Sequence, residues 1–501
     1  MKTSLNKKII AALTAALFTP VVALADDTFG GLTKAWTYTH TTAGQTSEIA
    51  AFDAATNSLW VAGIAGVDVL NANNGSLIQH IDTSSFGSIN SVAIHNGVAA
   101  FAIESNARTT AGTVKFYDTA TRSLSSGVNS ITVGALPDML TFTKDGSKLL
   151  VANEGTPDVY GTRIGTTTPR VYGPAAVDPA GSVSIIDMST RTLTATAGLV
   201  GVPTAGSNIR VNTGMNYEPE YIAVNATGTK AHVTLQEANA IGVLDLNTNS
   251  FEKIIGLGAK DFSQPGNTID TNNNSIINFG SANVKGLYMP DGIAAYEAAG
   301  VTYLVTANEG DFREDDADRS AASSLGATGD LAPLRVVNTD SSSGNLFAAG
   351  ARDFTIRNVD GSIVYSSGDI LDKKAAELGI YDDGRSRDKG VEPEGVELMT
   401  LGGKTFAFIG LERTTKGAVG IFDITDPANT TFLSMLITDG DLAPEGLEGF
   451  VMGGNYYLAI ANETSKTTTL YNLAPVPEPE TYALLIAGLG LMGFQVRRRR
   501  F

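Results

Sequence analysis

A short motif, in which proline is followed by an acidic residue, any residue and an aliphatic residue, recurs five times in this chain, and a second acidic residue follows it each time at nearly the same distance. The five copies read LPDMLTF, EPEYIAV, MPDGIAA, EPEGVEL and APEGLEG. The paired acids lie 16 to 18 residues apart: Asp138/Glu154, Glu220/Glu237, Asp291/Glu309, Glu394/Glu412 and Glu445/Glu463. A regular period of this kind indicates a repeat architecture.

Two less regular copies precede these five. The segment INSVAIHNGVAAFAIESN carries Asn90 and Glu104 at the two motif positions. The segment SEIAAFDAATNSLWVAGIAG carries Glu48, with Ile64 or Ala65 where its second acid would lie. The sequence therefore contains seven repeat units, of which the first lacks one acid.

Each unit alternates short apolar stretches with turns rich in Gly, Asn, Asp and Thr. In the unit that opens with EPEYIAV, residues 221–225 and 240–246 are such stretches, and NATGTK is the turn after the first. This pattern is typical of an antiparallel meander. Seven such units predict an all-β, seven-bladed β-propeller, whose closure removes the sheet edges. A segment near Trp36–Thr39 is expected to complete the last blade. A β-sandwich is the alternative fold, but it gives no reason for the same acid to return in every unit.

The period also places the carboxyl groups. The first acid opens one strand and the second closes the next, so the two are neighbours in an antiparallel hairpin. Radial repetition then brings the acids to one mouth of the central channel. We expect them to bind a divalent cation, with Ca²⁺ preferred over Mg²⁺, because the chain offers hard oxygen ligands and has no Cys. The expected ligands are Asp138, Glu154, Glu220, Glu237, Asp291, Glu309, Glu394, Glu412, Glu445 and Glu463.

A structural role for these acids is the competing interpretation. Acidic residues beside proline often accept backbone N–H groups in turns and need no ligand. Arg413, directly after Glu412, is placed to neutralise one of them. The four histidines (His40, His80, His95 and His232) fall at unrelated places in their units, and no nucleophile, phosphate-loop or dinucleotide motif is present. The sequence therefore predicts no catalytic or organic-cofactor residues.

The two ends of the chain are predicted to be targeting signals. Residues 1–25 carry three lysines, an apolar run and an Ala-Leu-Ala site, the pattern of a cleaved signal peptide. Near the other end, the Val476-Pro477-Glu478-Pro479 segment precedes an apolar stretch and four arginines. Residues 476–501 resemble the PEP-CTERM sorting signal of Gram-negative bacteria. That resemblance implies a short transmembrane helix, processing by an exosortase-type enzyme, and delivery to the cell surface or extracellular matrix.

Charge bears on the possible partners of the remaining domain, residues 26–475. The full chain carries a net charge of −17. Removing the three lysines of residues 1–25, and the four arginines and two glutamates of 476–501, leaves −22. A body this acidic is a poor partner for nucleic acid. Seven units running from end to end favour one domain.

Uneven spacing between the units indicates long insertions. Residues 155–180, residues 256–288 and the stretch between Glu309 and Glu394 exceed what a meander needs. The last stretch begins with an acidic run at 311–318, which lacks the order of an EF-hand and is expected to be solvated. It also contains the strand-like segments FTIRN and SIVYS and a helix-like segment, LDKKAAELGI.

Longer phrases of the chain resemble a known family. LPDMLTFTKDGSKLLVANEG, MPDGIAAYEAAGVTYLVTANEGDFRE, GLERTTKGAVGIFDITDP and APEGLEGF are similar to sequences of the choice-of-anchor I family, which in turn resembles mesenchyme-specific cell surface glycoproteins. The resemblance implies a YVTN/WD40-like propeller displayed at the cell surface. Some relatives carry an alkaline phosphatase label, but no nucleophile motif here supports it.

Three classes of function remain open. The first is a non-catalytic surface or matrix protein that binds a divalent cation and, through it, an acidic or polysaccharide ligand. The second is a metal-dependent phosphoester hydrolase, alkaline phosphatase-like or phytase-like, in which clustered carboxylates hold the metal. The third is a quinone- or nicotinamide-dependent oxidoreductase, for which no motif is present.

Overall fold

A computed structural model describes residues 31–313 and 318–473, and Leu32–Leu473 form one compact unit. This unit is all-β, as predicted: the described residues hold a single α-helix, α2 (Ile370–Glu377), among strands, turns and loops. Within the described ranges, no helix has the length and apolar character needed to cross a membrane. The predicted signal segment 1–25 and sorting segment 476–501 lie outside the described residues.

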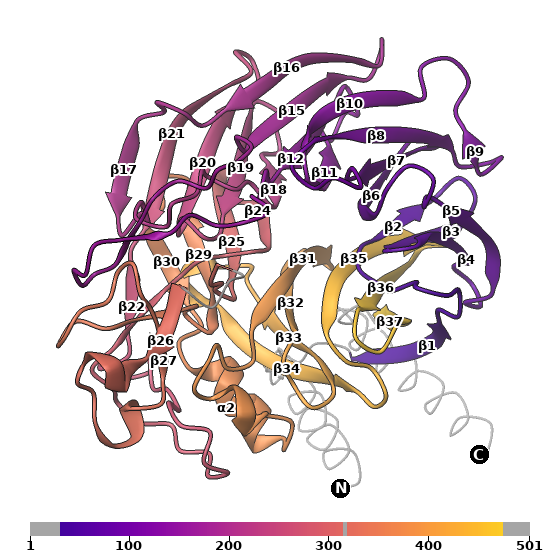
Figure 1. The fold of residues 1–501 in the computed structure, drawn as a ribbon. Helices are drawn as coiled ribbons and strands as arrows, with labels where there is room; N and C mark the ends of the chain where they lie inside the picture. The colour runs from indigo at the N-terminus through magenta and orange to yellow at the C-terminus, as the bar shows by residue number, and fades with distance from the viewer. Residues whose placement is uncertain (1–30, 314–317, 474–501) are drawn as a thin grey trace, which may run out of the picture. The chain divides into compact units, whose positions relative to one another are not determined.

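The first three of the main sheets are antiparallel meanders (Figure 1). Sheet 1 consists of β2 (Ala50–Asp53), β3 (Ser58–Gly63), β4 (Gly66–Asn71) and β5 (Leu77–Asp82). Sheet 2 consists of β6 (Ile89–His95), β7 (Val98–Ile103), β8 (Ala111–Asp118) and β10 (Ser130–Ala135), with β9 (Ser123–Leu124) beside β8. Sheet 3 consists of β11 (Pro137–Phe142), β12 (Lys148–Asn153), β15 (Ser182–Asp187) and β16 (Thr192–Gly198).

Four further sheets repeat the same plan. Sheet 4 consists of β18 (Ile222–Val224), β19 (Lys230–Leu235), β20 (Ala240–Asp245) and β21 (Ser250–Leu257), with β17 (Thr204–Ser207) parallel to β21. Sheet 5 consists of β24 (Ile293–Ala298), β25 (Val301–Asn308), β29 (Asp353–Asn358) and β30 (Ile363–Ser366). Sheet 6 consists of β31 (Pro393–Leu401), β32 (Lys404–Leu411), β33 (Gly417–Asp423) and β34 (Thr431–Thr438). Sheet 7 consists of β35 (Pro444–Met452), β36 (Asn455–Asn462), β37 (Thr467–Leu473) and β1 (Leu32–Thr39).

The first strands of the seven meanders touch one another in a closed cycle. Their order of contact is β2, β6, β11, β18, β24, β31 and β35, and β35 then touches β2 again. In Figure 1 these strands surround a common centre, and the later strands of each sheet lie progressively farther out. The motif acids, which sit at or next to the start of the first strands, are therefore brought together at the centre.

The core lies between the faces of consecutive sheets. One buried cluster joins Val183 of sheet 3 to Val233 of sheet 4, and another joins Trp60 of sheet 1 to Phe101 of sheet 2. A strand inside such a stack is buried on both faces, so its sequence is a run of apolar residues and does not alternate between apolar and polar ones. The buried residues of β12, LLVAN, have this character.

Sheet 7 is closed by the N-terminal strand. β1 pairs antiparallel with β37 from Leu32↔Leu473 to Thr39↔Thr467, which confirms that the segment near Trp36–Thr39 completes the last unit. Beyond it, buried His40 lies 2.7 Å through Nδ1 from the Asp68 carboxylate and 2.8 Å through Nε2 from the Thr468 hydroxyl. These contacts join sheet 1 to sheet 7, where the two ends of the cycle meet.

The insertions build smaller elements outside the meanders. Residues 155–180 contain the hairpin β13 (Arg163–Ile164) and β14 (Val171–Tyr172). Two further small sheets arise from β22 (Ala259–Asp261), β23 (Lys285–Leu287) and β28 (Phe347–Ala349), and from β26 (Arg319–Ala321) and β27 (Arg335–Val337). They enclose their own apolar cluster around Phe262 and Leu334. FTIRN lies within β29, SIVYS contains β30, and the helix-like segment overlaps α2.

Candidate functional site

The two acids of a unit are held together by the backbone of its first hairpin. Glu154 N donates to Leu136 O at 2.8 Å, and Glu463 N donates to Ala443 O at 2.8 Å. The acceptor in each case is the residue before the motif proline, two positions ahead of the first acid. The expectation that paired acids are hairpin neighbours is confirmed in these units.

A local irregularity positions the first acid. The pairing register shifts between Pro137 and Leu140, between Pro393 and Val396, and between Pro444 and Leu447, so the acid and the residue after it lie in a β-bulge. The residue before the proline has a positive φ in four copies: Leu136, Met289, Glu392 and Ala443. Bulges re-aim side chains at the rims of closed sheets. The repeated proline-acid motif therefore encodes a backbone shape as well as a charge.

Glycine after the acid allows adjacent sheets to approach closely. A Cβ on Gly446 would lie 2.2 Å from the carbonyl oxygen of Glu48 in sheet 1. A Cβ on Gly395 would lie 2.3 Å from Glu445 O in sheet 7. Because both obstacles are backbone atoms, neither can be relieved by a side-chain movement. These glycines set the spacing of the inner strands, and with it the spacing of the acids.

Gly446→Ala is accordingly expected to lower the free energy of unfolding by roughly 2 to 3 kcal/mol, as overpacking of a tight contact does. Thermal denaturation measures the change. The control is Gly198→Ala in β16, where a Cβ would meet nothing within 4 Å. Equal stability of the two variants would show that the inner strands can separate freely.

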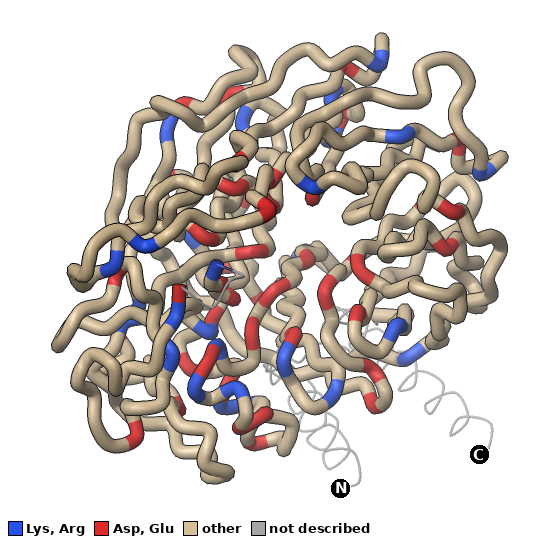
Figure 2. The backbone as a smooth tube through the Cα atoms, in the orientation of Figure 1, with Lys and Arg blue, Asp and Glu red and all other residues tan. Residues whose placement is uncertain are grey.

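The acids gather in one cavity at the centre of the cycle. Its volume is about 360 Å³, and eight of the ten predicted ligands line it: Asp138, Glu154, Glu220, Asp291, Glu309, Glu394, Glu412 and Glu445. Asp311 adds a ninth carboxyl group, while Lys389 and Arg413 are the basic residues in the lining. Figure 2 shows acidic residues at the inner ends of several sheets. The cavity thus carries a large excess of negative groups.

Two predicted ligands lie apart from this cavity. Glu237 lines a separate pocket of about 280 Å³ next to Tyr217, and one of its buried carboxylate oxygens has no hydrogen-bond partner in the described part of the chain. Glu463 does not line the central cavity, although its charge raises the pKa of Glu445. The central ring is therefore smaller than the repeat pattern predicted.

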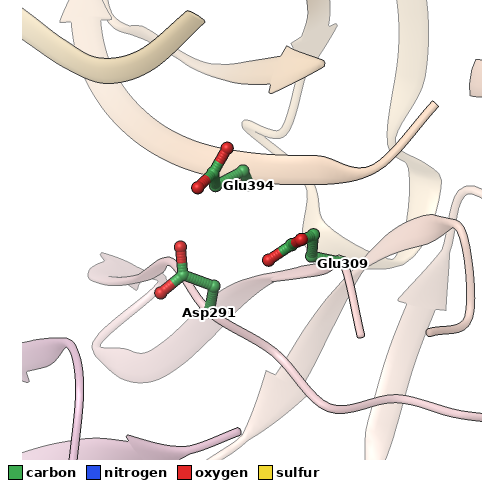
Figure 3. A group of neighbouring side chains, drawn as sticks. All are labelled: Asp291, Glu309 and Glu394. Atoms are coloured by element: carbon green, nitrogen blue, oxygen red, sulfur yellow. The ribbon is translucent and has the colours of Figure 1, made fainter. Parts of the chain in front are cut away.

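Three acids inside the cavity have the spacing of a metal site. Asp291, Glu309 and Glu394 each offer a carboxylate oxygen, and these oxygens lie within 4.8 Å of one another. Figure 3 shows the three side chains, from two sheets, directed into a common space. Close by, Glu220 is only 8% exposed, and within residues 31–313 and 318–473 neither its Oε2 nor Glu394 Oε2 has a hydrogen-bond partner. Buried oxygens without donors call for a cation or a proton.

A second group of acids is already neutralised. Glu309, Glu392 and Glu412 also have oxygens within 4.8 Å of one another. Lys389 Nζ donates to Glu309 Oε1, to Glu392 Oε2 at 2.9 Å and to Gly310 O at 2.7 Å. Arg413 lies 2.6 Å from Glu412, so the predicted internal neutralisation by Arg413 is confirmed. The protein supplies its own cations on this side of the cavity.

Several acids of the cavity, Glu412 of the second group among them, have perturbed pKa values. Burial, followed by the charge of Glu412, raises the pKa of Glu394 well above its ordinary value, and burial followed by the charge of Glu48 does the same for Glu445. Burial and the charge of Glu309 raise the pKa of Glu412 to about 8. Desolvation and repulsion both disfavour the charged form. Without a bound cation, several of these groups keep their protons at neutral pH.

A second central cavity, of about 440 Å³, is lined by residues of all seven first strands. The two central cavities share the lining residues Ile49, Met139, Tyr221 and Glu445, so these residues lie between them. The second cavity holds two more acids, Glu397 and Glu448. Glu448 Oε1 accepts from Phe52 N at 3.1 Å, so it fastens sheet 7 to sheet 1 and has a structural role.

The acidic run at 311–318 differs from its prediction. Residues 314–317 lie outside the described ranges, but Asp318 is fully buried. Its carboxylate accepts from Arg210 at 2.7 Å and from the Arg313 backbone at 3.1 Å. The expectation of a solvated run is therefore wrong at Asp318, because an arginine distant in the sequence provides a buried partner.

Several residues of the site were missed by the sequence analysis. Gln236, which donates to Glu309 Oε2 at 2.8 Å, precedes the second acid of its unit, where three other units have Asn. Lys389 belongs to a basic stretch, RSRDK, just before the EPEG motif. Tyr221 and Asp311 follow or neighbour motif acids. The position of the basic stretch was a usable signal that part of the ring is internally compensated.

Comparison with known proteins gives two family matches. A choice-of-anchor I domain matches residues 48–427, and a PEP-CTERM protein-sorting motif matches residues 475–500. Such motifs are processed by exosortases, and together the two matches point to an exported, surface-sorted protein. No curated protein matches the chain.

Among solved structures, hydrazine synthase of Kuenenia stuttgartiensis is similar to this chain. The identity is 10% and the TM-score 0.49, over 87% of this chain and 98% of that one. Identity this low gives no information about ligand or chemistry. The domain match, by contrast, covers more than half of the chain and extends from sheet 1 to sheet 6. The chain belongs to the choice-of-anchor I domain family.

Proposed function

We propose that this chain is a seven-bladed β-propeller, exported and sorted to the surface of a Gram-negative bacterium, whose acidic central cavity binds a divalent cation. The protein acts as a non-catalytic binding module at the cell surface or in the extracellular matrix. The closed cycle of first strands supports the propeller. The sorting motif supports export, processing by an exosortase-type enzyme and a transient membrane anchor formed by the C-terminal segment.

The observation that carries the cation proposal is the Asp291, Glu309 and Glu394 group. Its oxygens converge within 4.8 Å, and the adjacent buried Glu220 oxygen has no donor among the residues that the structure describes. Six to eight oxygen ligands suit Ca²⁺, which accepts irregular geometry, whereas Mg²⁺ requires a near-ideal octahedron. A set of carboxylates without Cys or His disfavours Zn²⁺.

The same charge excess restricts the ligand. An anion entering a cavity lined by nine acids and two bases meets repulsion unless a cation lies between. We propose that an acidic polysaccharide or another carboxylate-bearing surface ligand reaches the protein through the bound cation. Neutral hydroxyl groups of a sugar could complete the coordination, as water does at many Ca²⁺ sites.

The test is calcium-dependent thermal stability. Chelation should lower Tm, and Ca²⁺ should restore it better than Zn²⁺, because a ligand at a hundredfold excess over Kd stabilises by about 2.7 kcal/mol. Glu394→Gln combined with Glu445→Gln should abolish this response and leave the chelated protein at least as stable. The matched control is Glu377→Gln on α2, whose partner Lys374 lies at the surface.

The opposite pattern would identify the acids as turn and hydrogen-bonding residues: no effect of chelator, and Gln variants that are simply less stable. The same samples address the hydrolase alternative. Cation-dependent release of phosphate from a phosphomonoester, lost in the Gln variant and kept in Glu377→Gln, would favour a metal-dependent phosphoester hydrolase over a binding module.

A further inference from the structure

The central cavity contains two groups of carboxylates that share one member. Glu309 belongs both to the group with Asp291 and Glu394 and to the group with Glu392 and Glu412. The two groups therefore lie side by side, joined by the Glu309 carboxylate. Geometry alone would admit a cation in each.

The second position holds the ammonium group of Lys389. Its Nζ contacts Glu309 Oε1, Glu392 Oε2 and Gly310 O, and lies 3.9 Å from Asp311. Burial lowers the pKa of Lys389, but Glu309 and Glu392 outweigh this effect and raise it well above its ordinary value. A charged ammonium with three oxygen partners is satisfied in the manner of a bound monovalent ion.

Among the described residues, no such group occupies the first position. Glu220, more than nine-tenths buried, has an oxygen with no donor in this part of the chain, and so does Glu394. Of the three acids at this position, Glu309 alone has hydrogen-bond donors on both carboxylate oxygens among the described contacts. Its Oε2 accepts from Gln236 at 2.8 Å, and its other oxygen contacts Lys389. The two positions therefore differ in one respect: the chain fills the second with its own ammonium group and leaves the first without a cation.

We propose that the cavity is a two-cation site in which Lys389 permanently supplies one cation, so that the protein binds a single divalent ion, at Asp291, Glu309 and Glu394. Glu309 bridges the ammonium and the divalent ion. This inference rests on the cation binding proposed above and assigns its stoichiometry. Lys389 also sets affinity, because its charge lies across one carboxylate from the bound metal and partly repels it.

Removing this charge should open the second position. In Lys389→Met the side chain loses its charged end group and is one atom shorter, and Glu309, Glu392 and Glu412 face one another with less compensation. Calorimetric titration with Ca²⁺ at pH 8 should give one ion per chain for the unchanged protein and two for Lys389→Met. Lys374→Met, which removes a surface lysine paired with Glu377, should keep one.

The outcomes separate the two claims. If the unchanged protein binds no Ca²⁺, the proposed function fails. If it binds one ion and Lys389→Met also binds one, cation binding stands and the role of Lys389 is overturned; two ions in the unchanged protein overturn it as well.

A crystal of the unchanged protein soaked in Mn²⁺ covers the case in which the variant does not fold. An anomalous peak among Asp291, Glu309 and Glu394 alone supports the inference. A peak among Glu309, Glu392 and Glu412 contradicts it.

Discussion

A chain lacking residues 31–40 is expected to lose most of its folding stability, although the deletion removes no motif. β1 pairs with β37 along the whole strand, and each ladder hydrogen bond contributes roughly 1 kcal/mol. Trp36 and Tyr38 of β1 also pack against the cluster between sheets 7 and 1. The combined loss is on the order of 5 kcal/mol or more, comparable with the whole stability of many domains.

The deletion should also expose a strand edge. β37 would present unpaired backbone N–H and C=O groups, which can pair with a strand of another chain. We therefore expect a strongly lowered Tm in thermal denaturation together with oligomers in size-exclusion chromatography. Thr33→Ala, an exposed substitution in the same strand, is the control and should change neither. A deleted chain that stays monomeric and melts normally would show that the cycle of sheets does not depend on β1.

The hairpin placement of the acids was predictable because it depends on local rules. A proline, a bulge and a turn fix which residues of a two-stranded unit are neighbours, and the same short motif repeats these rules in each unit. Asp138 and Glu154 come together for this reason, and so do Glu394 and Glu412. The N-terminal closing strand was predicted from the same repeat together with the need to close the cycle.

The exceptions come from contacts between distant segments. In sheet 4, Arg210 from the loop before the motif donates its backbone N–H to Ala238 O and its guanidinium to Glu237 O. Arg210 is in turn held by Asp318, 108 residues away. Glu237 therefore lines the pocket beside this loop, while its charge adds to burial in raising the pKa of Glu220 in the central cavity. The repeat pattern of the sequence cannot predict such contacts, because an insertion from another unit supplies the partner residue.

The charge balance of the cavity could not be predicted from the sequence for the same reason. The sequence suggested Arg413 as an internal partner because it adjoins Glu412. Lys389 is the larger contributor, but its main partner, Glu309, lies 80 residues away on another sheet. Whether a carboxylate in a repeat is compensated depends on which insertion loop folds back over it. Residue type and spacing do not carry that information.

We expect the calcium-free protein to lose stability as the pH rises from about 5 to 8. Burial raises the pKa of Glu412 to about 8, and it raises the pKa values of Glu48 and Asp311 to about 7. In the unfolded chain such groups titrate near pH 4. Between those values the folded state holds protons that the unfolded state has released, so stability falls with rising pH. A carboxyl raised by two units contributes roughly 2.7 kcal/mol to this fall.

Calcium should reverse the trend, because it binds the deprotonated carboxylates and becomes more competitive as their protons leave. The rise in Tm on adding Ca²⁺ is therefore expected to be larger at pH 8 than at pH 5. Glu394→Gln with Glu445→Gln should flatten the calcium-free profile, since both groups have pKa values raised well above the ordinary range. Asp145→Asn is the control: its neighbours Thr143 and Ser147 lower the pKa of Asp145 to about 2, outside the window.

The measurement is Tm against pH in chelator and in Ca²⁺ for all three proteins. The comparison with the Gln variant isolates the contribution of the central carboxyl groups. A calcium-free profile that rises with pH, or one that the Gln substitutions leave unchanged, would mean that the central acids are ionised and compensated within the protein. Because a buried carboxylate without a donor is costly, compensation of that kind would require partners beyond Lys389 and Arg413, and the cavity would then have no vacancy for a cation.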